Sequence, residues 1–431
     1  MTSTPSVTEA VHGSFVLDGG RGLTAALSAL LKALEPQPAL LALGEPTHLE
    51  PAFAHLRNRI LKVLVEHGFR SIAVESDRIA ALEVDAFVRG GAGTLDQVMA
   101  EGFSHGFGRL DANRELVAWL REHNEGRPAD EQVAFHGFDA PLETLSAPSP
   151  RRYLKHLHGF LSEHLGPDAF LHGRADRDGH LDRLLGDDER WSNSAAVLEV
   201  GRSIGASPDA LELRAVTDDL LTTLYARLPH LVAASSRAAW QLAELHGRTA
   251  LGLLRYHSQL AEIAPPDRRL SRLTGVRDTL MAENLLDIRA RERRRGPTLV
   301  FAHNAHLQRN PSSMDMGGTA VGWFSAGAVT STLVGDQYAF VVTSLGSSTT
   351  IGLDAPPANT YEDVLQQAAP AGCALFDANR LRKALAAPDG PAPLVRTDVR
   401  PEQGYFPLGA AILEQCDAVL HVASASGGAS G

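Results

Sequence analysis

Two carboxylates and three histidines in this sequence follow short apolar runs at which buried strands would end. Glu45 and His48 follow one such run, Glu75 ends a second, and His303 and His306 follow a third. Side chains of these types can hold zinc, with the last two histidines and one further residue as ligands. They can also exchange protons, because imidazole changes its charge near neutral pH and a carboxylate can orient it. Their spacing alone leaves both kinds of chemistry open.

Each of these side chains also has a purely structural interpretation. A single histidine among the 18 of the chain is more often a helix cap or a partner of buried backbone groups than a catalyst. Glu45 and Glu75 could likewise cap the helices that follow them, or pair with Arg57 or Arg70. A shared site explains better why so many such groups stand at the ends of separate strands. We therefore treat all five as candidates for a catalytic site.

The elements that carry these residues have the pattern of an α/β fold. Residues 39–43 and 71–74 are apolar without alternation, which is typical of strands buried on both faces. Residues 51–66 repeat apolar side chains at helical spacing and are followed by a glycine, and 23–34 form an earlier helical face. Strand, helix and strand with short connections predict a βαβ unit, so we expect the first two strands to be parallel neighbours.

The remaining strands are predicted on both sides of a long helical segment. Residues 142–296 show helical periods without a convincing strand, and the stretch 172–191, rich in Gly, Asp and Arg, is interpreted as a mobile loop. We expect an α/β fold with a mostly parallel buried sheet, flanked by helices and interrupted by a large helical insertion. Further strands are predicted at 132–135, 298–301, 338–342, 374–376 and 418–421. The predicted parts are core residues 1–141, the insertion 142–296, core residues 297–423 and a flexible tail, 424–431.

A second set of candidates concerns contacts with a substrate. Ligands of open α/β sheets bind at the carboxyl ends of the strands, and Asp139 follows the third predicted strand. Helical spacing places Arg277, Met281 and Asn284 on one face, a mixture that is unusual for a core. We predict that these four residues bind substrate, although a solvated helix edge is also plausible. Arg57 lies about two and a half helical turns after His48, so it can either reach the site or face solvent.

Two Gly-x-Ser-x-Gly motifs raise the possibility of a serine hydrolase. A nucleophile elbow requires a serine on a sharp turn from a strand into a helix. Ser104 follows a stretch that reads as a short polar helix, so we reject it. Ser203 follows a stretch that is ambiguous between helix and strand but lies in the helical segment, so it stays a weaker alternative.

Composition restricts the class of protein and its compartment. The 431 residues carry a formal net charge of −11, which argues against a nucleic-acid partner. Two cysteines, Cys373 and Cys416, are too few for a disulfide framework and lack the spacing of a metal knuckle. The first residues do not have the pattern of a signal peptide, and no apolar run is long enough to span a membrane. We expect a cytoplasmic protein; its oligomeric state is not predicted.

The order of several short motifs resembles that of the erythromycin esterase family. The motifs are Gly-Glu-Pro-Thr-His at 44–48, Leu-Arg at 56–57, Gly-Phe at 68–69 leading to Val-Glu at 74–75, Gly-Phe-Asp at 137–139 with Pro141, Arg-Asp at 277–278 with Met-Ala at 281–282 and Asn284, and Ala-His-Asn-Ala-His at 302–306. Each motif is short, and their succession over most of the chain makes the resemblance specific. Leu49 departs from the pattern, because many relatives carry glycine there.

The resemblance implies an α/β fold with a helical lobe and a deep cleft between the two parts. It also implies hydrolysis of a macrolactone ester without a serine nucleophile, a metal or another cofactor. By motif position, the general base of the family falls on His48 and its supporting acidic residues on Glu45 and Glu75. The positions used around the same cleft fall on Arg57, His303 and His306.

We therefore expect a metal-independent esterase that hydrolyses a macrolide-type or other bulky natural-product lactone, with His48 activating water. An enzyme of the same fold could instead use His48 for cyclisation or elimination in a biosynthetic pathway, because fold constrains the site more than the product. A weaker alternative is a non-catalytic protein that binds a metal or haem through its histidines. The expected partner is a small-molecule natural product that serves as the substrate, and a role in antibiotic resistance is expected.

Overall fold

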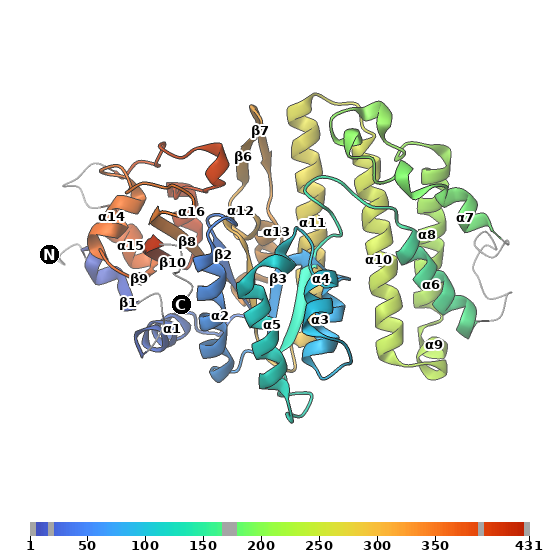
Figure 1. Cartoon of the computed structure of the whole chain (residues 1–431), viewed down its shortest axis with the longest axis horizontal. Helices are drawn as coiled ribbons and strands as arrows, with labels where there is room; N and C mark the ends of the chain where they lie inside the picture. Colours follow the sequence, from blue (N-terminus) through green and yellow to red (C-terminus); the bar gives the residue numbers. More distant parts are fainter. Residues whose placement is uncertain (1–5, 16–20, 166–178, 387–391, 426–431) are drawn as a thin grey trace.

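The computed structural model describes residues 6–15, 21–165, 179–386 and 392–425, which form an eight-stranded sheet with helices on both faces (Figure 1). The order of the strands is β1-β9-β10-β8-β2-β5-β3-β4. This arrangement confirms the predicted α/β class. The strands are β1 (Val11–Phe15), β2 (Leu40–Glu45), β3 (Ser71–Asp77), β4 (Ala134–Asp139), β5 (Thr298–His303), β8 (Tyr338–Ser348), β9 (Cys373–Asp377) and β10 (Ala418–Ala425).

The sheet is mostly parallel and its central strands are buried. From β10 to β4, every neighbouring pair is parallel, whereas β9 runs antiparallel to both β1 and β10. Every residue of β2, β3, β4 and β5 is buried. Burial on both faces explains why these strands read as continuous apolar runs in the sequence.

The prediction that the first two strands are neighbours was wrong. β5 lies between β2 and β3 and pairs in parallel with both, Glu45 opposite His303 on one side and Val74 opposite Phe301 on the other. The βαβ rule fixes the direction of two strands joined by a helix, but it leaves room for a later strand to enter between them. Residues far apart in the chain are thereby brought together at the middle of the sheet.

Helices cover the sheet on two sides, each with its own hydrophobic cluster. One cluster joins the sheet to α1, α2, α3 and α5, and another joins the opposite face to the last turns of α11 and to α14–α16. The bounds are α1 (Arg21–Ala33), α2 (Pro51–Glu66), α3 (Ala81–Val88), α4 (Leu95–Glu101), α5 (Asp111–Asn124), α12 (Asn304–Leu307), α13 (Ala326–Val334), α14 (Tyr361–Ala368), α15 (Ala378–Leu385) and α16 (Ala410–Gln415).

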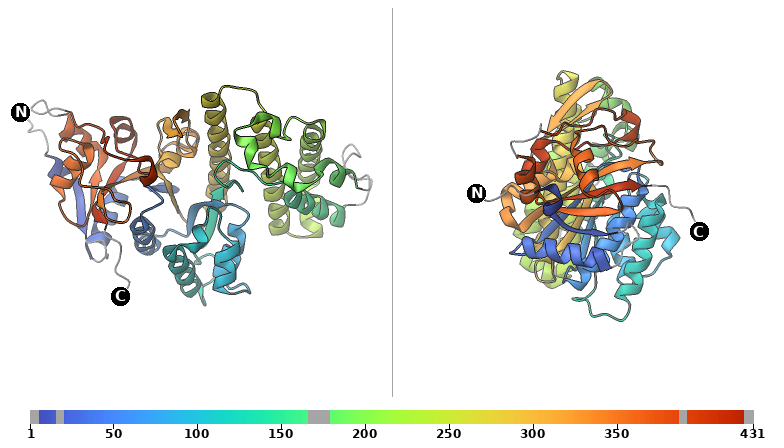
Figure 2. Two further views of the ribbon diagram at one scale, coloured as in Figure 1. Left: turned by 45° about the horizontal axis from the view of Figure 1, so that its top comes forward. Right: turned by 90° about the vertical axis from the view of Figure 1, so that its left-hand side faces the viewer.

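A helical lobe extends from one end of the sheet, and α11 stands between the sheet and the other helices of the lobe (Figures 1 and 2). A separate cluster of buried leucines, with Trp191 and Trp240, forms its core. Two helices of the lobe, Pro208–Ala226 and Leu228–Ala234, are separated by a break at Arg227, and Pro229 lies in the first turn of the second one. The lobe contains α6 (Arg151–His164), α7 (His180–Leu185), α8 (Pro208–Ala226), α9 (Leu228–Ala234), α10 (Arg237–Leu260) and α11 (Pro266–Glu292).

Three other segments differ from the sequence-based expectation. In the predicted loop 172–191, residues 172–178 lie outside the described residues, and the rest contains α7 and a 3-10 turn, Asp188–Arg190. β10 continues to Ala425, two residues into the predicted tail, and 426–431 are not described. The short strand β1 and the hairpin of β6 (Ser312–Met316) and β7 (Thr319–Trp323) were missed, because polar residues and glycines obscure their patterns.

Two further predictions from the sequence concern membrane-spanning segments and disulfide bonds. In the described part of the chain, no helix is both long and apolar enough to cross a membrane. Cys373 and Cys416 are both buried and free.

Candidate active site

Four neighbouring strands end in polar side chains at one edge of the sheet. Glu45 ends β2, His303 ends β5, Asp139 ends β4, and Glu75 lies two residues before the end of β3. These strands are parallel, so their carboxyl ends meet at the same edge. The sequence-based expectation that four strand ends converge is confirmed.

The first imidazole–carboxylate pair lies in the connection from β2 to α2. His48 Nδ1 is 2.7 Å from Glu45 Oε1, and His48 Nε2 is 3.6 Å from Glu75 Oε1. The side chain of His48 stays 32% exposed. Burial disfavours the charged ring, but the carboxylates of Glu75 and Glu45 outweigh it and raise the pKa of His48 above its ordinary value. The ring is therefore cationic at neutral pH.

The second imidazole–carboxylate pair joins the sheet to the helical lobe. His306 lies on α12, directly after β5, and its Nδ1 is 3.0 Å from both carboxylate oxygens of Asp278 on α11. Asp278 also accepts a hydrogen bond from the backbone N–H of Ala326, which fixes the carboxylate. Burial opposes ionisation of His306, but Asp278 and Glu75 outweigh it and raise its pKa. Its orientation is thus set by the lobe.

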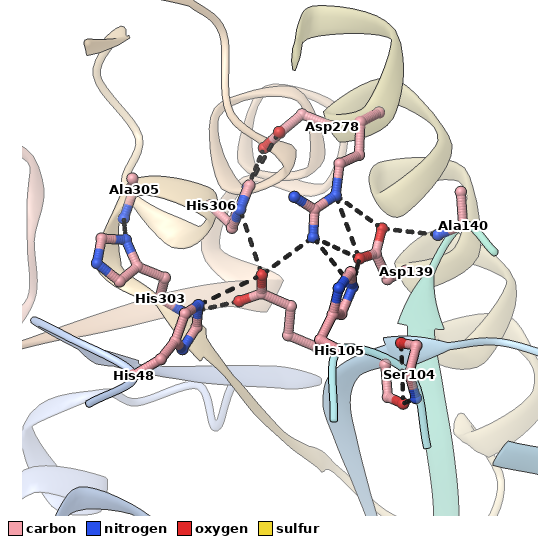
Figure 3. A network of polar contacts seen from close by, with 12 residues as sticks. His48, Ser104, His105, Asp139, Ala140, Asp278, His303, Ala305 and His306 are labelled. Carbon is pink, nitrogen blue, oxygen red and sulfur yellow. Dashed lines mark hydrogen bonds and ion pairs between the residues drawn. The ribbon is translucent and has the colours of Figure 1, made fainter. Parts of the chain in front are cut away.

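Glu75 stands between the two imidazoles. Its Oε1 atom is 3.4 Å from His306 Nε2 and accepts a hydrogen bond of 3.2 Å from Arg277 Nη2. In Figure 3, dashed lines from the labelled His48 and His306 meet at one carboxylate. Its Oε2 atom accepts the backbone N–H of His303 at 2.9 Å. Burial alone would raise the pKa of Glu75, but the positive charges of His306, His48 and Arg277 hold it well below the ordinary value. Glu75 is therefore a permanent carboxylate.

Asp139 and His105 hold Arg277 in place. The guanidinium of Arg277 donates to both oxygens of Asp139, and His105 Nε2 lies 2.9 Å from Asp139 Oδ2 (Figure 3). Despite burial, Asp139 and Glu75 raise the pKa of Arg277, and Arg277 and His105 lower that of Asp139. Asp139 is completely buried by these partners, so it supports Arg277 and Glu75.

His303 has a different environment from the other two histidines. Its Nδ1 accepts the backbone N–H of Ala305 and caps α12 (Figure 3). Burial, reinforced by the nearby His48, lowers the pKa of His303 to about 3, so the ring is neutral. It lies beside His48, with ring centroids 5.1 Å apart. His303 therefore lies at the site as a neutral side chain that caps α12.

A cavity of about 210 Å³ opens beside His48, between the strand ends and the helices α2 and α5. Glu45, His48, Glu75 and Arg57 line it, together with an apolar wall that includes Phe103, Phe107 and Phe301. Arg57 is 2% exposed, and its guanidinium packs over the Phe301 ring at 4.9 Å. Burial lowers the pKa of Arg57 to about 10, so it remains charged at neutral pH. Arg57 was predicted either to reach the site or to face solvent, and the structure shows that it reaches the site.

None of the four predicted substrate contacts, which are Asp139, Arg277, Met281 and Asn284, lines this cavity. Met281 is completely buried in the hydrophobic cluster on the face of the sheet that α14–α16 cover, where it packs as an ordinary core residue. Asn284 donates a hydrogen bond to the backbone oxygen of Phe138. Helical spacing correctly placed Met281 and Asn284 on the same face of α11 as Arg277. In the turns after Arg277, however, α11 packs against β4.

Sequence reasoning missed His105 and Asp278 as parts of the site. His105 has a φ of 59°, which is unusual for a residue other than glycine, and it lies inside the rejected serine motif, directly after Ser104. Asp278 directly follows Arg277, and a search for carboxylates on the same helix turn could have found it. Both lie in segments far from the strand ends in sequence, so only the fold shows their contacts.

The two serine motifs do not form nucleophile elbows. Ser104 follows α4 and is buried; its backbone N–H donates to Ser76 Oγ, and its own Oγ accepts from the backbone N–H of Asp77. Ser203 follows a 3-10 turn, Val200–Arg202, and donates to the backbone oxygen of His257. In the described ranges, no three His, Cys, Asp or Glu side chains are arranged to hold a metal ion. The arrangement is instead suited to proton transfer between imidazoles and carboxylates.

The fold and the site define a class: an α/β protein with a helical lobe and an imidazole–carboxylate centre at the edge of its sheet. The chain belongs to the erythromycin esterase family, whose sequence model matches residues 64–425. The matched range contains Glu75, Asp139, Arg277 and His306, whereas Glu45 and His48 precede it. No match is found among curated proteins.

Three solved structures share the fold at low sequence identity. A Bacillus cereus protein superposes with a TM-score of 0.70 at 15% identity, over 97% of this chain and 96% of that one. A succinoglycan biosynthesis protein gives 0.66 at 16% identity, over 98% and 96%. A mutant of the erythromycin esterase EreC in its open conformation gives 0.66 at 18% identity, over 97% and 98%.

Proposed function

We propose that this protein is a metal-independent esterase that hydrolyses a macrolide-type or other bulky natural-product lactone, with His48 as the general base. Membership of the erythromycin esterase family supports the reaction class. The observation that carries the role of His48 is its geometry: Glu45 engages Nδ1, which leaves Nε2 directed toward Glu75 at the edge of the cavity. A carboxylate that orients an imidazole in this way also stabilises its charged form.

In the proposed reaction, His48 first releases to solvent the proton that its carboxylate partners favour. The neutral ring then accepts a proton through Nε2 from a water molecule as that water attacks the ester carbonyl. Negative charge develops on the carbonyl oxygen, and the guanidinium of Arg57, which lines the same cavity, stabilises it. His306 then protonates the leaving alkoxide, and the carbon–oxygen bond of the ester breaks. The products are a carboxylic acid and an alcohol. His48 then gives its proton to solvent and His306 takes one from solvent, which restores both rings.

Glu75, Asp139 and Arg277 support this reaction by their fixed charges. Arg277 is held by Asp139, and it places its own Nη2 against Glu75 Oε1. The negative charge of Glu75 stabilises the cationic ring of His48 after proton transfer and the cationic ring of His306 before it. We therefore assign Asp139 and Arg277, which the sequence suggested as substrate contacts, to the support of Glu75.

The size of the cavity bears on how a bulky substrate would bind. Pockets that bury a drug-sized ligand measure roughly 300–1,000 Å³, and the cavity beside His48 measures about 210 Å³. It therefore takes the part of the substrate next to the ester carbonyl, against Phe103, Phe107 and Phe301. The rest of a macrolactone would lie outside it, near the half-exposed side chain of Leu49.

Mass spectrometry of reactions with a panel of macrolides and linear esters tests this proposal. A product heavier than the substrate by one water molecule supports hydrolysis of a lactone, whereas isomerisation or loss of water supports the biosynthetic alternative. A panel left unchanged by folded protein contradicts the proposal. A fluorophosphonate should leave the activity intact, because Ser203 lies on a turn and is bonded to the backbone of the lobe.

A further inference from the structure

Arg57 is a buried cation whose hydrogen bonds go to a neutral group. Its Nε and Nη2 atoms donate to Asn58 Oδ1 at 3.1 and 2.7 Å. The carboxylates of Glu45 and Glu115 act on it only through space. Two other buried arginines differ in this respect, because Arg396 pairs with Asp398 and Arg78 pairs with Asp287. Among the residues that the structure describes, the guanidinium of Arg57 at the cavity wall is therefore balanced only by carboxylates that do not touch it.

The side-chain amide of Asn58 is held in one orientation by its two neighbours. Its Nδ2 donates to the backbone oxygen of Ala112 in the first turn of α5, at 2.7 Å, while its oxygen accepts from Arg57. Asn58 is itself only 6% exposed. A carboxylate at this position could accept from Arg57, but it would face the oxygen of Ala112 without a proton to donate. The surroundings of residue 58 therefore suit an amide.

The difference between an amide and a carboxylate matters for a cation in a buried pocket. A carboxylate in contact with a guanidinium neutralises it, and the attraction is strong where water is excluded. An amide oxygen fixes the direction of the guanidinium and leaves its charge available to another group. Donors that are fixed in advance stabilise an oxyanion without a cost of reorientation during the reaction.

We propose that Asn58 is a positioning residue, which aims the Arg57 guanidinium at the cavity and leaves its positive charge unpaired for an anionic oxygen of the substrate. This inference rests on the role of Arg57 in the proposed function. It adds a residue that touches neither the substrate nor the reacting atoms. It also explains why α2 carries two consecutive buried polar residues beside an apolar wall.

The variant Asn58→Asp tests the inference without removing a partner of Arg57. The new carboxylate pairs with Arg57, so we expect kcat to fall by roughly tenfold or more while KM changes little, because the interaction lost is made mainly in the transition state. The same variant should bind butyrate, a small carboxylate, more weakly than the wild-type protein does in isothermal titration calorimetry. Asn58→Gln, which keeps an amide, should recover part of both effects.

Asn124→Asp is the matched control. Asn124 is also a buried amide that donates to backbone oxygens, those of Val88 and Val133, but neither of these partners lines the cavity. This variant should lower the thermal stability and leave kcat and butyrate binding of the folded protein unchanged. A loss of function from Asn58→Asp that merely reflects a damaged amide network would appear in both variants and would overturn the inference.

The calorimetric measurement separates this inference from the proposed function. Butyrate binding that depends on Asn58, in a protein that hydrolyses no ester of the panel, supports the inference and removes the esterase. Hydrolysis and butyrate binding that both stay within twofold of wild type in Asn58→Asp overturn the inference and leave the esterase intact. Wild-type protein that fails to bind butyrate overturns the inference as well.

Discussion

Two imidazole–carboxylate pairs approach Glu75 from different parts of the molecule. Glu45 and His48 both belong to the exit of one strand of the core, three residues apart. Asp278 belongs to α11 of the helical lobe and reaches His306 on the core, 28 residues along the chain. Both rings present Nε2 to the same carboxylate oxygen, at 3.6 and 3.4 Å. The sheet alone therefore builds one half of the site, and the lobe completes the other half.

The two pairs also differ in their exposure to solvent. The side chain of His48 is 32% exposed, and it borders the cavity. The side chain of His306 is 13% exposed, and its partner Asp278 is completely buried. A ring at the edge of the cavity can reach water and substrate, whereas a buried ring is held more firmly. This difference agrees with a base at His48 and an acid at His306, and four experiments can test it.

The substitution His48→Gln should have the largest effect. Glutamine cannot accept a proton from water at neutral pH, so kcat/KM should fall by roughly a hundred- to ten-thousandfold. Steady-state kinetics on a lactone cleaved by the wild-type enzyme would measure this loss. The control is His67→Gln, at the exposed end of α2, which should keep normal activity. A folded His48→Gln variant with near wild-type turnover would remove the proposed mechanism.

The substitution Asp278→Asn should have the next largest effect. Asparagine can still hydrogen-bond to the backbone of Ala326, but it no longer supplies the charge that keeps His306 protonated. Loss of such an orienting carboxylate costs roughly ten- to a hundredfold in activity. Asp287→Asn, on the same helix but paired with Arg78 and Arg291, controls for damage to the lobe. If both variants lose activity equally, Asp278 has no special role.

The sequence predicted the pair in the core better than the pair shared with the lobe. Apolar runs without alternation identified the buried strands, and the polar residues directly after them identified Glu45, His48, Glu75 and Asp139. The positions of these residues at the strand ends agree with the prediction, because each position depends on a few consecutive residues. The insertion of β5 between β2 and β3 depends on contacts between distant segments, and so does the approach of Asp278 to His306. No local pattern records either one.

The errors in the site have the same origin. Helical spacing placed Arg277 and Met281 on one face of α11, yet it could not show that this face passes from the polar site into the hydrophobic core within one turn. Similarly, nothing near Arg57 in the sequence showed that Asn58 and Phe301 would turn it toward the cavity. The types of side chain were predictable, whereas their neighbours were not.

The substitution Glu45→Gln should lower the pKa of His48 and leave the pKa of His306 almost unchanged. Glu45 and Glu75 together raise the pKa of His48, so removing one negative charge should lower that pKa by roughly one unit. A base must be neutral to act, so hydrolysis should then begin at lower pH than in the wild-type enzyme. NMR of histidine-labelled protein, with signals assigned through His48→Gln and His306→Gln, would follow both rings. An equal shift of His306 would show that the two pairs titrate as one unit.

Added salt should produce the smallest and most selective effect. Mobile ions screen charges that are in contact with solvent and act weakly on buried pairs. The carboxylates raise the pKa of His48 at a partly exposed position, so high salt should lower this pKa, although by less than Glu45→Gln does. The pKa of His306 is raised by Asp278 inside the protein, so it should move less. The same NMR titration in low and high salt measures both changes, with a chloride and a sulfate salt compared to detect specific anion binding. If His306 responds as strongly as His48, solvent reaches both rings equally, and the division into an exposed base and a buried acid is wrong.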